Sequence, residues 1–249
     1  MTADETNNTV KRKRIVITEN GPYRVEGNIP LVSKTQVVSE HGEPLTWQKD
    51  GEIVVPQGDY YLCRCGKSSN KPFCDGTHRK VEFDGTETAD TTAAGIRKSI
   101  IPRGTGIVVE KASSLCMLSG YCGFSDATLG RLMTATQDTK MRALIMAMVE
   151  HCPSGALTYR IEADGPEIEP DLPQQIAITT EITSFGSIAG PLWVTGGIPI
   201  ERSDGQLFET RSRVTLCNCG HSCNKPLCDG THRDMAQREE WERRRRENQ

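Results

Sequence analysis

The chain contains the sequence CRCGKSSNKPFCDGTH at residues 63–78 and a near copy, CNCGHSCNKPLCDGTH, at residues 217–232. Both copies have the spacing C-x-C-x8-C-x3-H. Three cysteine thiolates and one histidine provide four ligands, the number that one tetrahedral metal ion or one small iron–sulfur cluster requires. The rest of the chain is therefore expected to form a scaffold that presents two such sites.

Sequence similarity between the two halves extends beyond the cysteines. The sequence GPYRVEGNIPL at residues 21–31 aligns with GPLWVTGGIPI at residues 190–200. Alternating apolar residues on either side of a glycine turn predict a strand, a turn and a second strand in each copy. We therefore expect an α+β, mostly β fold in which each motif has its own small β-cap.

Between the repeats the composition changes, which suggests five segments. We expect a flexible N-terminal tail at residues 1–13, a first metal-binding unit at 14–90, a middle segment at 91–180, a second metal-binding unit at 181–236 and a charged C-terminal helix at 237–249.

The middle segment contains Cys116, Cys122 and Cys152, with Ser119 midway between the first two. Residues 139–152 have apolar side chains at helical spacing, and a proline follows directly, which predicts an amphipathic helix that ends there. In one interpretation Cys152 is only a small apolar residue of that helix. In the other, three cysteines and one substituted ligand position follow the layout of a single-cluster bacterial ferredoxin.

Composition and charge limit the classes of function. Aromatic residues make up only 5% of the 249 residues, so the core is lean and bound metal is expected to supply part of the folding free energy. A net charge of −3 provides no global basic field, so we expect no nucleic-acid partner.

The N-terminus is acidic and lacks an apolar run, and no apolar stretch approaches the length of a membrane span. We therefore expect a cytoplasmic protein with no membrane partner. In that compartment ten cysteines are better explained as metal ligands than as disulfides, and a histidine at a fixed offset has no role in a disulfide framework.

The spacing alone leaves zinc and iron–sulfur open. Structural zinc sites usually have cysteines two to four residues apart, and C-x-C followed by eight residues departs from that pattern. A two-iron cluster needs two ligands on each iron, and the close pairs Cys63/Cys65 and Cys74/His78 would divide in that way. The spacing therefore modestly favours iron–sulfur.

The motif Cys-Asp-Gly-Thr-His, preceded by C-x-C-G and Asn-Lys-Pro-x-Cys, resembles the CDGSH iron–sulfur family over about sixteen residues in each copy. Thr77 and Thr231 replace the serine of the family name and keep its hydroxyl group. The resemblance implies one [2Fe–2S] cluster per motif. The implied ligands are Cys63, Cys65, Cys74 and His78 in the first motif, and Cys217, Cys219, Cys228 and His232 in the second.

Family members with one motif form homodimers whose subunits build a shared β-cap over two clusters. A tandem chain is therefore expected to form this arrangement internally, as a monomer with pseudo-two-fold symmetry. The middle segment is similar to a divergent mono-cluster 4Fe–4S domain, which would make it a ferredoxin-like α+β insert. Its matching positions are Cys116, Cys122 and Cys152, and with Ser119 in the fourth position the site would hold [3Fe–4S], a [4Fe–4S] with serine or water as ligand, or no cluster.

Three functions follow from this chemistry. The first is an electron carrier that passes single electrons to a redox partner protein, and the second is a cluster donor to an apo iron–sulfur acceptor or a redox or pH sensor. The third is a zinc-binding interaction module. We expect no catalytic residues, because the chain has no phosphate loop, HExxH motif or recognisable Ser–His–acid set.

Overall fold

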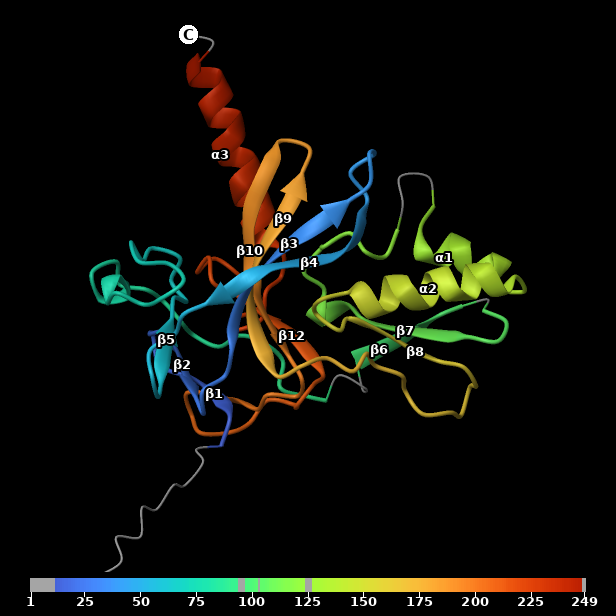
Figure 1. The fold of residues 1–249 in the computed structure, drawn as a ribbon, viewed down its shortest axis with the longest axis horizontal. Coiled ribbons are helices and arrows are strands. Elements are labelled where there is room, and N and C mark those ends of the chain that lie inside the picture. The colour runs from blue at the N-terminus through green and yellow to red at the C-terminus, as the bar shows by residue number, and fades with distance from the viewer. Residues whose placement is uncertain (1–11, 94–96, 103, 124–126, 248–249) are drawn as a thin grey trace, which may run out of the picture.

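The computed structural model describes residues 12–93, 97–102, 104–123 and 127–247. Of the tail expected at residues 1–13, positions 1–11 lie outside the described residues. The described part contains two sheets at the centre, an insert on one side and a long helix, α3 (Thr231–Glu247), that projects away from the sheets (Figure 1).

Each central sheet combines strands from both repeats. The first sheet has the order β11 (Ile200–Glu201), β1 (Arg14–Ile17), β2 (Tyr23–Glu26) and β5 (Tyr60–Leu62). The second has the order β12 (Arg213–Leu216), β10 (Gly186–Thr195), β9 (Gln175–Thr183), β3 (Leu31–Val38) and β4 (Pro44–Ile53).

Two parallel pairings join the repeats reciprocally. Strand β1 of the first repeat pairs with β11 of the second, with Ile15 opposite Ile200. Strand β9 of the second repeat pairs with β3 of the first, with Ile176 opposite Leu31. All other neighbours in these sheets are antiparallel. Each repeat therefore completes the sheet of the other.

The insert contains an antiparallel sheet covered by helices. Its strands are β6 (Lys98–Ile101), β7 (Val108–Ala112) and β8 (Leu157–Arg160), and its helices are α1 (Leu129–Leu132) and α2 (Thr139–His151), with 3-10 turns at Ser113–Leu115 and Met133–Ala135. Asp138 begins α2 by accepting a hydrogen bond from the Lys140 amide. Ile145 and Val149 are buried, which confirms the predicted amphipathic helix.

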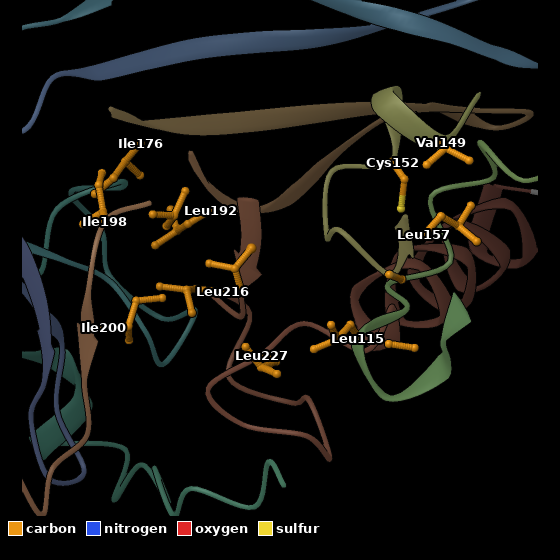
Figure 2. Packing of buried hydrophobic residues seen from close by; sticks show 14 of the residues in the cluster. Leu115, Val149, Cys152, Leu157, Ile176, Leu192, Ile198, Ile200, Leu216 and Leu227 are labelled. Carbon is orange, nitrogen blue, oxygen red and sulfur yellow. The ribbon is translucent and has the colours of Figure 1, made fainter. Parts of the chain in front are cut away.

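One hydrophobic cluster connects the central sheets with the insert. It extends from Ile176 and Leu192 in the second sheet to Val149 and Leu157 in the insert (Figure 2). Arg213 of β12 is fully buried at this junction. Its guanidinium donates to the carbonyls of Glu150 and Leu157 and pairs with Glu169 at 3.1 Å. The insert is therefore packed and hydrogen-bonded onto the second repeat.

The α+β, mostly β fold expected from the sequence is confirmed. Two expected boundaries fall within continuous elements. The boundary at 180/181 lies inside β9, because the ladder with β10 continues to Thr183. Helix α3 (Thr231–Glu247) begins inside the second motif, so the helix expected from residue 237 is the continuation of an earlier start. Within the described ranges, no helix has the length and apolar character needed to cross a bilayer.

Candidate metal centres

The first motif folds back on the end of β5. The amide of Cys63 donates to the carbonyl of Pro72 at 2.8 Å, and the amide of Cys74 donates to the carbonyl of Tyr61 at 2.9 Å. These bonds hold the motif's first and third cysteines on neighbouring backbone segments. The Sγ atoms of Cys63 and Cys65 lie 3.9 Å apart, and Cys74 Sγ lies 3.4 Å from Nδ1 of His78.

The second motif repeats this arrangement after β12. The amides of Cys217 and Cys228 donate to the carbonyls of Pro226 and Thr215 at 2.8 and 2.9 Å. The Sγ atoms of Cys217 and Cys219 are 3.6 Å apart, and Cys228 Sγ is 3.4 Å from Nδ1 of His232.

These separations fit metal ligation. Sulfur at about 2.3 Å and nitrogen at about 2.0 Å from a tetrahedral ion place two sulfurs about 3.8 Å apart, and a sulfur and a nitrogen about 3.5 Å apart. In both motifs the Cys–Cys and Cys–His pairs lie close to these values. Among the described His, Cys, Asp and Glu residues, no three group around one point as ligands of a single ion. The four residues of each motif instead form two pairs, each able to hold one metal ion.

An aspartate fixes the turn that carries each histidine. Asp75 accepts hydrogen bonds from the amides of Ser69 and Thr77, and these amides hold its pKa well below the usual range. The N-cap of the 3-10 turn Thr77–Arg79 is Gly76, and Asp75 lies one residue before it. Asp229 makes the corresponding bonds with the amides of Cys223 and Thr231 in the second motif.

In the second motif, the surroundings of Cys217 favour deprotonation of its thiol. A hydrogen bond from Cys219 lowers the pKa of Cys217 to about 6, against the effect of burial, and nearby backbone amides lower it further. Burial raises the pKa of Cys228. In the first motif, burial lowers the pKa of His78 and neighbouring Arg79 lowers it further, which favours the neutral imidazole that a metal requires.

The two motifs contact each other through the backbone after each C-x-C pair. Gly66 faces the carbonyl of Cys219, and Gly220 faces the carbonyl of Cys65 so closely that a methyl group on it would lie 2.5 Å from that oxygen. Both glycines have positive φ angles, +74° and +84°. Glycine is therefore required at this junction for its backbone conformation and for the close approach of the loops.

Tyr23 also links the first repeat to the second motif. Its buried hydroxyl donates to the carbonyls of Cys217 at 2.7 Å and Pro226 at 3.2 Å. The guanidinium of Arg64, between two candidate ligands of the first motif, lies 5.7 Å from the centre of the Tyr23 ring. No repeated pattern indicated this role of Tyr23, since the aligned residue of the second repeat is Leu192.

The three central cysteines line one cavity of about 200 Å³, together with Ser119 and Lys111. Cys152 is buried, and Cys116 and Cys122 are half-buried. Burial raises the pKa of Cys122; Lys111 opposes this effect, and the nearby thiols of the other two cysteines add to it. The structure therefore brings the three residues together.

The loop that carries Cys116 and Cys122 has an unusual backbone and fixed anchors. Leu118 has a φ of +60°, a conformation that is strained for a bulky side chain and is concentrated at functional sites. Asn224 of the second motif donates to the Ser114 carbonyl at 2.7 Å, and Arg233 donates to the Leu118 carbonyl at 2.6 Å. The central loop therefore rests on the second motif.

Comparison with known families agrees with this geometry. Residues 20–79 and 189–233 each match a family model described as "Iron-binding zinc finger CDGSH type". Each matched region contains one motif and strands of both central sheets, and both regions are similar to CDGSH-type iron-binding domains. The central cysteines lie between the matched regions. No curated protein matches the chain.

Proposed function

We propose that each motif binds one [2Fe–2S] cluster and that the protein carries electrons to a redox partner protein. The observation that supports this most directly is the division of each ligand set into a Cys–Cys and a Cys–His pair at the span of one tetrahedral ion. A two-iron cluster needs two such pairs. The proposed ligands are Cys63, Cys65, Cys74 and His78, and Cys217, Cys219, Cys228 and His232.

When bound, the clusters would supply one-electron redox chemistry. The single neutral histidine makes each site less negative than four thiolates would, so we expect a higher reduction potential than that of an all-cysteine cluster. The protein contributes two turns held by aspartate, which orient Nδ1 of His78 and His232 toward the cysteine partner.

Contact between the sites favours electron transfer. The loops of the two motifs touch at Gly66 and Gly220, and the central cysteine loop is bonded to the second motif by Asn224 and Arg233. We propose that Cys116, Cys122 and Cys152 hold a third cluster, [3Fe–4S] or [4Fe–4S], in the cavity that they share. Three centres whose loops are linked in this way within one chain would suit a relay.

One observation favours the alternative of a cluster donor. Cys74 and His78 are half-buried and line an open cavity of about 970 Å³, into which an acceptor's thiolate could reach. Incubation of the loaded protein with an apo-ferredoxin separates the two functions. Transfer of the cluster to the apo-ferredoxin supports a donor, whereas oxidation of the reduced protein by an oxidised, cluster-loaded ferredoxin, with the iron of the protein retained, supports a carrier.

The proposal is tested by iron and acid-labile sulfide per chain after anaerobic purification. Two filled motifs give about four irons, and a filled central site raises this to about seven or eight. Cys63→Ser and Cys217→Ser should each remove about two irons, whereas Cys223→Ser, an exposed cysteine outside the ligand set, should remove none. A colourless protein with zinc in place of iron would overturn the proposal and support the interaction module.

A further inference from the structure

The two motifs differ in the strands that precede them. Thr18 and Thr179 occupy equivalent places, since each hydroxyl donates to the carbonyl of the proline that follows the aligned glycine. From Thr18 to Gly21 the chain advances three positions, whereas from Thr179 to Gly190 it advances eleven. The extra residues extend the β9–β10 hairpin in the second repeat alone.

Glu181 lies on this extension and is completely buried. Its Oε1 atom lies 3.1 Å from Nε2 of His232, and its Oε2 atom lies 3.3 Å from Nη1 of Arg233. The opposite nitrogen of the ring, Nδ1, faces Cys228 at 3.4 Å. The imidazole is therefore held from both sides, with one nitrogen toward the candidate metal and the other toward a carboxylate.

This geometry sets the tautomer of His232. A neutral histidine that binds metal through Nδ1 keeps its proton on Nε2, and here that N–H donates to Glu181. A carboxylate in this position orients the ring and makes it a stronger donor to the metal, and loss of such a partner typically costs 10–100-fold in metal affinity. Arg233 partly balances the buried charge and is itself partly exposed.

The first motif lacks this support. Within the described part of the chain, His78 has no carboxylate at hydrogen-bond or ion-pair distance, and its ring borders the cavity of about 970 Å³. Exposure alone does not separate the sites, because a groove of about 640 Å³ beside α3 also reaches His232 and Cys219. The clear difference between the two histidines is the buried carboxylate behind one of them.

We propose that Glu181 is a positioning residue for His232, which makes the second cluster the more tightly held and the lower in reduction potential of the two. The first cluster is then the one that exchanges or is released. This inference rests on the proposed function, since both motifs must bind clusters. The potential falls because stronger donation from the histidine, next to a buried negative charge, disfavours an added electron.

The first test uses the unmodified, fully loaded protein. A chelator at fixed neutral pH should remove the two motif clusters in two phases, with rates that differ by roughly 10–100-fold. Cys74→Ser, which disrupts the first site, should remove the fast phase. A single rate for both clusters, or loss of the slow phase in Cys74→Ser, would overturn the inference while leaving cluster binding intact. A chain that binds no cluster would instead overturn the proposed function.

The second test replaces the carboxylate with its uncharged isostere. Glu181→Gln should bring the slow phase close to the fast one and raise the potential of one cluster in an EPR-monitored redox titration. Glu26→Gln is the matched control, because Glu26 is also a buried carboxylate paired with arginine, at 2.7 Å from Arg14 and 2.6 Å from Arg24. It should change neither potential. Equal shifts in both variants, or no shift in Glu181→Gln, would show that Glu181 has no positioning role.

Discussion

Replacing Gly220 with alanine would force the two metal-binding loops apart. The new methyl group would lie 2.5 Å from the carbonyl oxygen of Cys65 and 2.9 Å from its carbonyl carbon. Both atoms belong to a buried backbone segment of the other repeat, so neither can move as a flexible side chain would. The substitution thus tests whether the two motifs meet within one chain.

The expected loss of stability in Gly220→Ala has two parts. Placing a side chain at a φ of +84° costs about 1–2 kcal/mol, because a Cβ atom in the left-handed region crowds the following carbonyl. Over-packing against a fixed backbone adds about 1–3 kcal/mol. We therefore expect Gly220→Ala to lower the free energy of unfolding by about 2–5 kcal/mol, with partial loss of iron.

Gly42→Ala provides the control for the first part. Gly42 has a φ of +81°, and a methyl group on it would meet no atom within 4 Å. Urea unfolding of both loaded variants is followed by far-UV circular dichroism and visible absorbance. Gly220→Ala should be less stable than Gly42→Ala by the cost of over-packing, about 1–3 kcal/mol. Equal destabilisation of the two variants would refute the contact between the loops.

Three further predictions concern other contacts. Tyr23→Phe should lower the free energy of unfolding by about 1–3 kcal/mol and speed iron loss from the second motif, because the buried carbonyl of Cys217 loses its hydrogen-bond donor. The control is Tyr60→Phe, since the Tyr60 hydroxyl donates to the carbonyl of Ile29; it should leave the rate of iron loss unchanged in the same chelator assay. Arg213→Met should cost about 3–5 kcal/mol, measured by thermal unfolding, since it leaves a partner carboxylate and two carbonyls without their cation. The fold lowers the pKa of His78, so the unfolded chain takes up a proton at a higher pH than the folded chain does, and the stability of the fold decreases as pH falls below about 6.5. Cluster absorbance should therefore decay faster below that pH. His78→Cys should remove this acceleration from the fast phase.

Local sequence patterns predicted the local structure well. Alternating residues predicted the strands on either side of each glycine turn, and helical spacing predicted α2. The parallel pairings β1–β11 and β3–β9 could not be read from these patterns, because alternation specifies which face of a strand is buried and not which distant strand lies beside it. That arrangement was implied only by the resemblance to dimeric relatives.

Buried charges were the main features that sequence reasoning missed. Arg64, Arg213 and Glu181 are all at most 2% exposed, although such residues are almost never fully buried without a partner. Their partners are backbone carbonyls or side chains distant in sequence, so no short motif indicates them. The one available signal for Glu181 was that, when the repeats are aligned, the segment from Thr179 to Gly190 is longer than its counterpart from Thr18 to Gly21.

A tandem chain can specialise its two sites in a way that identical subunits cannot. The backbone contact at Gly66 and Gly220 keeps the pseudo-symmetry, whereas the extended hairpin and the insert act on the second motif alone. Arg233 contacts both the extended hairpin and the insert, because it pairs with Glu181 and donates to the Leu118 carbonyl of the central loop. The second motif therefore contacts both other candidate centres. In the proposed relay, the second motif would therefore lie between the central cysteines and the first motif, and a firmly held cluster there would keep the relay intact.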